Sequence, residues 1–333
     1  MTPAAGLTAT TPLWRDLCDR SETYTCYSAA LAAWAACADP SWGGFVNSGL
    51  TLTLVDADEG LFGFAHFPPG LRATLGLVRR GTDDAGEGVA GILDELGRQG
   101  RVIVAGDGFA LPWHVAAGRR HVPHWFVLSG SPSAPVVLDP FAYRSELGRQ
   151  EATLEPVDPS ALTRLALAHP GDDEVVRLRE SFALGDDARP FEHRRFQWFV
   201  RADAEVRAPA GATGPEAMRR LARHFREHGG QGEAYLQTDD IWSIARHRAF
   251  LALHAADFAA RSGGVPAEWV AGHIEPLAKR WAHMPPLLLQ ATLAIGAGRR
   301  PSGSVAETLD ELAEREAAAD SACPPDAKFL LVR

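Results

Sequence analysis

Cysteine is scarce in this sequence and never occurs in closely spaced pairs. The chain has four cysteines, Cys18, Cys26, Cys37 and Cys323, with neither a CxxC motif nor another spacing typical of metal ligands. We therefore expect no metal site and no bound cofactor. In a reducing compartment each cysteine would be a thiol, so each one needs its own explanation.

Long hydrophobic runs and long blocks of Lys or Arg are also lacking, and we expect no leader segment in residues 1–14. No stretch approaches the ~18 consecutive apolar residues of a membrane-spanning helix. Residues 1–14 lack the basic and hydrophobic parts of a secretory signal. A net charge of −9 without a block of Lys or Arg disfavours nucleic acid, because phosphate binding needs a basic face. We expect a cytoplasmic protein with neither a membrane nor a nucleic acid as partner.

Length and residue pattern indicate two domains. The chain has 333 residues, of which 46% are hydrophobic and 23% charged, and a domain typically takes about 150 residues. Short apolar strands and helices mix in the first part of the chain, whereas helical patterns dominate after it. The sequence predicts an α+β fold class, with an α+β domain at 1–145 and a mostly helical domain at 146–333.

Periodicity and turn residues predict the individual elements. In the first part we expect helices and strands at 26–37, 47–55, 62–66, 88–98 and 101–105. In the second part we expect a strand at 196–201 and helices at 218–228, 241–261, 268–284 and 304–319. Pro285-Pro286 should end the third of these helices. Residues 142 to about 173 are expected to form a connector, in which Asp158-Pro159-Ser160 should open a short helix.

Cys26 opens the first predicted helix. The run from Cys26 to Cys37 is rich in helix formers, and Ala-Asp-Pro follows it as a stop signal. The positive end of a helix dipole stabilises a thiolate, and the unpaired N–H groups there can donate to an oxyanion. Cys26 is therefore a candidate nucleophile.

His124 and Asp139 lie on two adjacent predicted strands. His124 heads the apolar run 125–128 and Asp139 ends the run 136–138, with a Gly/Ser/Pro turn between the two runs. A hairpin would bring the two side chains together, and a histidine oriented by a carboxylate serves as a general base. This pair and Cys26 form the candidate triad, although many proteins contain these three residue types in this order by chance.

Three further residues near these strands are candidate supporting or substrate-binding residues: Asp107, Tyr27 and Trp113. Asp107 ends the predicted strand 101–105 between two glycines, so it is either a turn former or a second acidic group at the site. Leu111-Pro112-Trp113 would form a rigid apolar connection across the site.

Histidines are frequent in the same region. His114, His121 and His124 lie within eleven residues, but His121 and His124 are separated by a proline and precede a strand, unlike paired zinc ligands on a helix. We assign His124 as the base, and His114 and His121 as loop or rim residues. His66 has no partner in view, so we expect it to be structural.

Five motifs resemble the butirosin biosynthesis protein H family: YTCYSAAL at 24–31, VIVAGD at 102–107, LPW at 111–113, HVPHWFV at 121–127 and VLDPF at 137–141. The resemblance covers about residues 13–145. It implies a papain-like cysteine-enzyme domain, with an antiparallel sheet and an N-terminal catalytic helix, followed by a mostly helical C-terminal domain. It also implies Cys26 as nucleophile, His124 as base, Asp139 as its orienting partner and Asp107 as a further site residue.

One departure concerns the oxyanion hole. The segment 19–23 lacks the glutamine that papain-like peptidases place before the cysteine. The backbone N–H of Cys26 would then carry more of the stabilisation, helped by Ser21 or a protonated Glu22.

The function implied by the resemblance is an acyltransferase of antibiotic or other natural-product biosynthesis. An acyl group would pass from the phosphopantetheine arm of an acyl or peptidyl carrier protein to Cys26, and then to an amine of a small-molecule acceptor or to an internal nucleophile. The same triad also suits a thioesterase or peptidase-like hydrolase, and a catalytically silent carrier-binding protein is a third hypothesis. Carrier proteins are usually acidic, so Arg119 and Arg120 are the predicted docking residues.

The helical part offers fewer signals. His247 and Arg248 form a charged pair that we interpret as the solvated side of a helix. Trp242, Phe250 and Trp281 are candidates for lining the acyl pocket, with plain core packing as the alternative for each.

Overall fold

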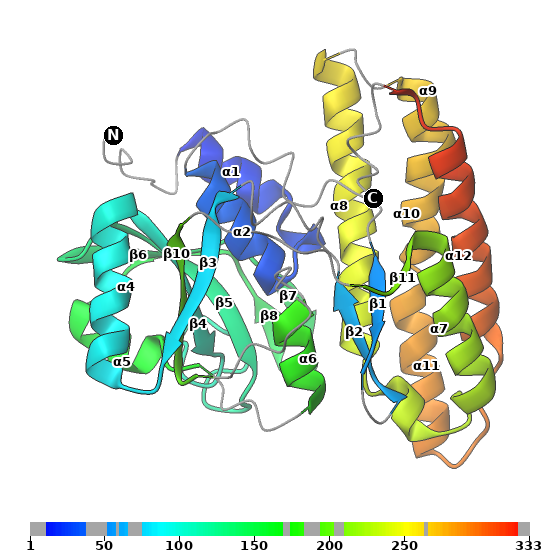
Figure 1. Ribbon diagram of the computed structural model, residues 1–333, viewed down its shortest axis with the longest axis horizontal. Helices are drawn as coiled ribbons and strands as arrows, with labels where there is room; N and C mark the ends of the chain where they lie inside the picture. Colours follow the sequence, from blue (N-terminus) through cyan, green and yellow to red (C-terminus); the bar gives the residue numbers. More distant parts are fainter. Residues whose placement is uncertain are drawn as a thin grey trace. The chain divides into compact units, whose positions relative to one another are not determined.

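The computed structural model describes residues 11–37, 52–57, 60–65, 75–168, 174–182, 194–202, 210–262 and 266–325 (Figure 1). The chain divides into two compact units. The first consists of Met1–Val46, Gly70–Arg177 and Phe191–Val206, and the second of Asn47–Pro69, Leu178–Pro190 and Arg207–Arg333. The fold is mixed α+β, with antiparallel sheets and a helical C-terminal region, as the sequence predicts at that level.

The two units interleave in sequence, so they differ from a single division at residue 145. Leu54 and Phe64 belong to strands near the start of the chain, yet they are buried in the hydrophobic core of the helical unit. Conversely, Phe196 and Trp198 lie beyond residue 145 and belong to the core of the first unit. The core in which its apolar side chains are buried decides to which unit a strand belongs, and its position along the chain does not.

A six-stranded antiparallel sheet forms the centre of the first unit, in the order β3-β10-β4-β5-β6-β9. Its strands are β3 (Leu77–Thr82), β4 (Arg101–Asp107), β5 (Pro123–Ser131), β6 (Ala134–Asp139), β9 (Thr153–Pro156) and β10 (Phe196–Arg201). The predicted strands at 101–105 and 196–201 are confirmed.

Helices α2 (Cys26–Ala36) and α4 (Ala85–Gln99) cover opposite faces of this sheet (Figure 1). Side chains alternate along a strand: Val102 and Val104 pack with α4, whereas Arg101 lies over the Trp34 ring of α2 at 4.4 Å. Both helices were predicted from their sequence patterns, and α4 ends at Gly100, whose φ of 70° is the left-handed conformation of a helix C-cap.

Shorter elements complete the first unit. They are α1 (Pro12–Asp19), η1 (Ser21–Thr23), β7 (Tyr143–Ser145), β8 (Gly148–Gln150), η4 (Pro159–Ala161) and α5 (Leu162–Leu165). The β7–β8 hairpin lies within the stretch that the sequence suggested to be a connector. Asp158 accepts a hydrogen bond from the Ser160 backbone N–H at 2.9 Å, which confirms the predicted helix entry there. The helix α6 (Glu174–Phe182) runs across the boundary between the units.

The second unit packs helices beside a small antiparallel sheet, β11-β1-β2. Its strands are β1 (Thr53–Asp56), β2 (Phe62–Ala65) and β11 (Ala212–Thr213). Its helices are α7 (Gly214–His228), η5 (Gly232–Tyr235), α8 (Thr238–Ser262), α9 (Ala267–Trp269), the π-helical η6 (Val270–Ile274), α10 (Glu275–Trp281), α11 (Met284–Gly296) and α12 (Ser304–Ser321). Residues 47–51 of the predicted strand 47–55, and His66, lie outside the described residues.

One prediction about the helical unit is partly right and another is wrong. The helix predicted at 268–284 ends close to the predicted stop, at Trp281, but Pro285-Pro286 then lie in the first turn of a further helix, α11, where proline is well accommodated because no N–H partner is lost. Arg248 is not solvated but 1% exposed. Its Nε and Nη2 donate to the two carboxylate oxygens of Glu316 in α12, at 2.8 and 3.2 Å.

His247 is likewise buried, at 2% exposure. Phe250 and Trp281 are also buried, and Trp281 donates its ring N–H to Glu316 at 3.1 Å. Core packing therefore accounts for these two aromatic residues. Trp242 contacts Arg246, whose guanidinium lies 4.3 Å from the ring centroid.

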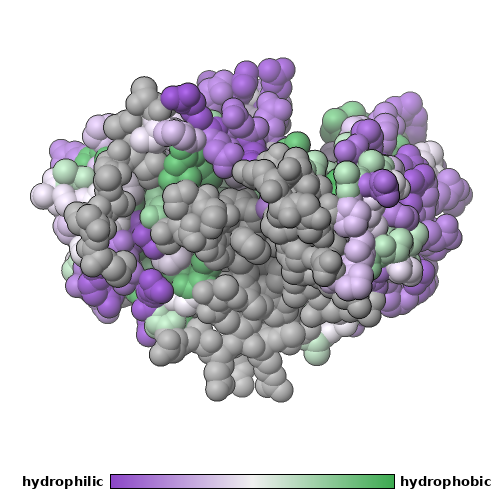
Figure 2. All heavy atoms as spheres, turned by 90° about the horizontal axis from the view of Figure 1, so that it is seen from above, coloured by the Kyte–Doolittle hydropathy of each residue, from purple (hydrophilic) through white to green (hydrophobic). Residues whose placement is uncertain are grey.

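The described surface is mostly hydrophilic on the face shown in Figure 2. Among the described residues, large hydrophobic side chains that are exposed include Phe109, Leu289 and Leu293. No helix in the described ranges has the length and apolar character needed to cross a membrane.

Candidate active site

Cys26 is the first residue of α2, and the helix start is held by a reciprocal capping box. The Thr25 hydroxyl accepts from the Ser28 N–H at 3.2 Å, and the Ser28 hydroxyl accepts from the Thr25 N–H at 2.8 Å. Residues 27–36 of α2 are all buried, and the alanines among them let the helix approach the sheet closely. Cys26 itself is half-buried. The predicted position of this thiol at a helix N-terminus is confirmed.

His124 and Asp139 meet where β5 and β6 lie side by side. The strands pair antiparallel with Val127 opposite Leu138. The start of β5 and the end of β6, which lie away from the connecting turn, are therefore next to each other. His124 Nε2 lies 2.7 Å from Asp139 Oδ2, and each side chain is 1% exposed. The hairpin predicted from the turn residues is therefore present, and it brings the two side chains into direct contact.

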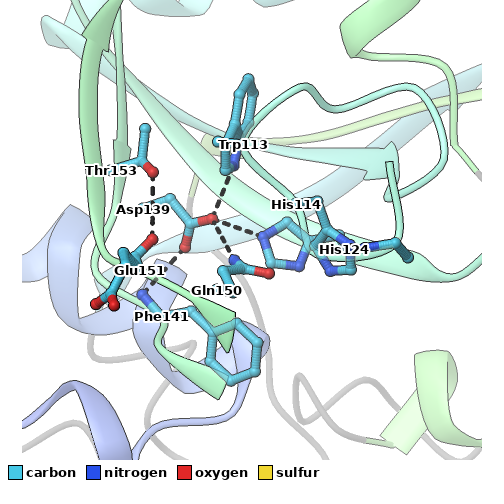
Figure 3. A network of polar contacts seen from close by, with 9 residues as sticks. Trp113, His114, His124, Asp139, Phe141, Gln150, Glu151 and Thr153 are labelled. Atoms are coloured by element: carbon cyan, nitrogen blue, oxygen red, sulfur yellow. Dashed lines mark hydrogen bonds and ion pairs between the residues drawn. The ribbon is translucent and has the colours of Figure 1, made fainter. Parts of the chain in front are cut away.

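Asp139 accepts hydrogen bonds from several sides, as Figure 3 shows. Besides His124, Oδ2 accepts from the ring N–H of Trp113 at 3.0 Å and from the side-chain amide of Gln150 at 3.3 Å. The Phe141 backbone N–H donates to Oδ1 at 3.1 Å. Four donors around one carboxylate fix its orientation.

Trp113 is therefore a supporting residue through Asp139. Gln150 is a further residue of this candidate site, and the sequence did not predict it. It lies in β8, in the polar segment 144–151, and no apolar periodicity marks this segment as part of the site. Only the fold of the β7–β8 hairpin places this side chain, which is 1% exposed, beside Asp139.

The environment of His124 favours its charged form. Burial by itself would lower the pKa of His124, but the charge and the hydrogen bond of Asp139, followed by the hydrogen bond and charge of Cys26, outweigh this effect and raise the pKa to about 10. Because Asp139 occupies Nε2, Nδ1 is the nitrogen left for Cys26. The structure therefore brings Cys26, His124 and Asp139 together in the order of a nucleophile, a base and an orienting carboxylate.

His114 lies next to His124, which the sequence did not indicate. The two imidazole rings pack edge to face with centroids 4.6 Å apart. Burial and the charge of His124 lower the pKa of His114 to about 3, so its ring is neutral. His114 does lie in the loop between β4 and β5, as predicted, but its side chain borders the base itself.

Asp107 does not contact the triad through any of its hydrogen bonds. Its Oδ1 accepts from the backbone N–H groups of Phe109 at 3.0 Å and Val122 at 3.2 Å. Its Oδ2 lies 2.5 Å from Nδ1 of His121, whose ring stacks on Phe109. Of the two interpretations of Asp107, the turn former fits these contacts: the carboxylate closes the ends of the loop that carries Trp113 and His114.

Tyr27 is buried at 5% exposure and packs against Trp125, with ring centroids 6.2 Å apart. Its ring therefore contributes to the packing of α2 against the sheet. The ring of Phe141 lies beside His124, with the two ring centroids 5.8 Å apart.

The two predicted docking arginines contact the β7–β8 hairpin. Arg119 donates to the carbonyl of Leu147 at 2.7 Å, and Arg120 lies 3.9 Å from the carboxylate of Glu146. Both side chains remain exposed. Ser21 and Glu22 form η1 before the cysteine, and the described residues include no hydrogen bond from either side chain to the triad.

A separate groove of about 510 Å³ lies in the helical unit, between β1, β2 and α7. The two arginines in it, Arg220 and Arg223, form ion pairs with Asp56 and Glu216. No residue of the triad lines this groove.

No protein-family model matches the sequence, and the comparison with curated proteins also found no match.

Proposed function

We propose that the chain is a cysteine-dependent acyltransferase on a papain-like scaffold, which takes an acyl group from a carrier-protein thioester and passes it to an amine or an internal nucleophile. The observation that carries the proposal is a cysteine at the N-terminus of a buried helix, next to a buried His124–Asp139 pair. The motifs shared with the butirosin biosynthesis protein H family support the choice of acyl transfer.

The first half-reaction follows from the charges of this site. Cys26 attacks the carbonyl carbon of the thioester as a thiolate, with the protonated His124 beside it. A carbon–sulfur bond forms and the carbonyl π electrons move onto oxygen. When the C=O bond reforms, the bond to the phosphopantetheine sulfur breaks, and the leaving thiolate takes the proton from His124. The products are Cys26 acylated as a thioester and the free thiol of the carrier.

The second half-reaction needs His124 in its neutral form. An amine attacks the acyl carbon while Nδ1 of His124 accepts the proton from nitrogen. The tetrahedral intermediate collapses, an amide forms, and Cys26 leaves as a thiolate beside the new imidazolium. Asp139 keeps Nε2 protonated throughout and stabilises the ring whenever it is charged, and Trp113 and Gln150 hold Asp139 in place.

Transfer from one thioester to another is nearly isoenergetic, so catalysis consists of positioning the acyl carbon and keeping water away. A hydrolase would use the same three residues and admit water in the second step. The two functions are therefore distinguished by the fate of the acyl-enzyme.

Intact-mass spectrometry tests the proposal. The protein is incubated with an acyl-loaded carrier protein, or with the butyryl thioester of N-acetylcysteamine, which mimics the end of the phosphopantetheine arm. We expect one acyl adduct in the wild type and none in Cys26→Ala. Cys18→Ala is the matched control: burial, and then Asp19, raise the pKa of the Cys18 thiol to about 11, so this thiol should not react and the adduct should persist in the variant.

The acylated protein is then divided into two samples, one in buffer alone and one in buffer that contains a primary amine. Release as the amide supports the transferase, whereas equal release as free acid in both supports a hydrolase. No adduct with several acyl chains would overturn the proposal and favour a protein that only binds the carrier.

A further inference from the structure

We propose that His114 is a catalytic residue, whose neutral ring donates its Nε2–H to the carbonyl oxygen of the acyl group while Cys26 attacks. This inference rests on the proposed acyl transfer and assigns the oxyanion donor of that reaction. The evidence is the hydrogen bonding of the His114 ring, its position against the base and the space that the loop leaves for it.

The tautomer of His114 follows from its backbone contact. The N–H of Ala116 donates to His114 Nδ1 at 3.1 Å, so Nδ1 is an acceptor and carries no proton. The proton of the neutral ring is therefore on Nε2. Within the described part of the chain, no side chain or carbonyl accepts a hydrogen bond from this nitrogen. A polar N–H without a protein partner thus lies beside the catalytic base.

A neutral ring is what this position requires. The imidazole of His114 is 4.6 Å from that of His124 between centroids, and Figure 3 shows the two rings side by side next to Asp139. Burial, together with the charge of His124, lowers the pKa of His114 to about 3. A second imidazolium would compete with His124 for the charge of Asp139, whereas a neutral imidazole can polarise a carbonyl without giving up its proton.

The loop leaves room for this ring at Gly108. A Cβ atom at Gly108 would lie 2.6 Å from His114 Nδ1, closer than atoms can pack. Any side chain at residue 108 would thus push the ring away from its contact with Ala116. Gly108, directly after β4, therefore leaves the space in which the His114 ring lies.

The sequence also lacks the usual donor. No glutamine precedes Cys26 in the segment 19–23, and the polar side chains of η1 form no hydrogen bond to the triad in the described residues. The Cys26 N–H at the start of α2 supplies one donor, because the first N–H groups of a helix have no partner within it. The Nε2–H of His114, whose ring packs against that of His124, supplies a second donor.

The role in the reaction is electrostatic. As the Cys26 sulfur–carbon bond forms, the carbonyl π electrons become an oxyanion, and this oxygen accepts hydrogen bonds from the Cys26 N–H and the His114 Nε2–H. When the carbonyl reforms, the leaving thiolate takes its proton from His124. His114 keeps its proton at every stage.

Comparing two reactions of the same thiol tests this role. Alkylation of Cys26 by iodoacetamide develops no oxyanion, whereas acylation by the butyryl thioester of N-acetylcysteamine does. In His114→Phe, which keeps a ring but has no donor, we expect the acylation rate to fall about 10²- to 10³-fold, the usual effect of losing one oxyanion donor. The alkylation rate should stay within about twofold. His114→Gln, which restores a side-chain N–H, should recover part of the acylation.

The control is His121→Phe, at a second histidine of the loop between β4 and β5 that is not part of the triad. This variant should leave the ratio of the acylation rate to the alkylation rate unchanged. Equal loss of both rates in His114→Phe would overturn the inference, since it would show that His114 only maintains Cys26 and His124. Unchanged acylation would overturn it as well. If the wild type is alkylated but never acylated, the proposed acyl transfer fails instead, so the two failures are distinguishable.

Discussion

Replacing Asp139 with asparagine should remove the positive charge from His124 at neutral pH. Burial lowers the pKa of the His124 ring, and the Asp139 carboxylate is the main group that counteracts this effect. It does so through its charge and through the 2.7 Å hydrogen bond to Nε2. An amide keeps the size of the side chain and one oxygen acceptor but has no charge. The variant therefore isolates the electrostatic contribution of Asp139.

The structure indicates how large this contribution is. Burial alone lowers the pKa of His124, so the rise from 6.5 to about 10 comes from Asp139 and, to a smaller extent, Cys26. At ~1.4 kcal/mol per pKa unit, this net rise corresponds to about 5 kcal/mol in favour of the charged ring, after the opposing effect of burial. Both side chains are 1% exposed, so salt screens the pair only weakly. The acylation rate of Cys26 should fall about 10³- to 10⁴-fold, as in other triads that lose the carboxylate.

Nitrogen-15 NMR of labelled histidine side chains measures the charge directly. At pH 8.5, about two units above the ordinary histidine pKa, we expect one imidazolium signal in the wild type and none in Asp139→Asn. Asp107→Asn is the matched control, because it removes a carboxylate from the exposed His121 and should leave the imidazolium signal in place. An imidazolium that persists in Asp139→Asn would refute the reasoning.

Further predictions concern stability and the support of the triad. The pKa of His124 is raised on folding from 6.5 to about 10, so the charged ring stabilises the folded state fully below pH 6.5, and this stabilisation is lost as the pH rises through about 10. The urea midpoint of the wild type should therefore fall more steeply between pH 7 and 10 than that of His124→Phe. Gln150→Leu removes a hydrogen bond to a carboxylate worth about 1.5–3 kcal/mol and should slow acylation about 10-fold or more, whereas Gln197→Leu, at a buried glutamine of β10, should lower stability without this effect. Glu316→Ala leaves the buried Arg248 unpaired and should destabilise the helical unit by about 3–5 kcal/mol in urea unfolding, with much of the loss recovered when Arg248→Met is added.

The parts of the site that could be predicted are those set by local sequence. Cys26 stands where a run of helix formers begins, and helix starts follow from local propensity and capping. His124 begins one apolar run and Asp139 ends the next, with a turn between them, and a hairpin needs only neighbouring residues to form. Their contact could therefore be expected before any tertiary structure was known.

Other members of the site depend on side-chain contacts between separate elements of the first unit. Gln150 reaches Asp139 because the β7–β8 hairpin folds back over the sheet, and no residue pattern in 143–150 marks this arrangement. His114 was assigned to the rim of a loop, since nothing in the sequence reveals that Gly108 leaves space for its ring. Local patterns do not contain this information, because side-chain contacts across a loop depend on its three-dimensional course.

The sequence by itself determined the helix that presents Cys26, the hairpin that joins His124 to Asp139, and the amphipathic stripe of α7, since each depends on residues close together in the chain. The tertiary structure decided that Arg248 is buried with Glu316, that β1 and β2 belong to the helical unit, and that His114 and Gln150 flank the triad. These features result from burying apolar surface and satisfying buried polar groups across long separations in sequence, and no local pattern can specify which distant segment supplies the partner.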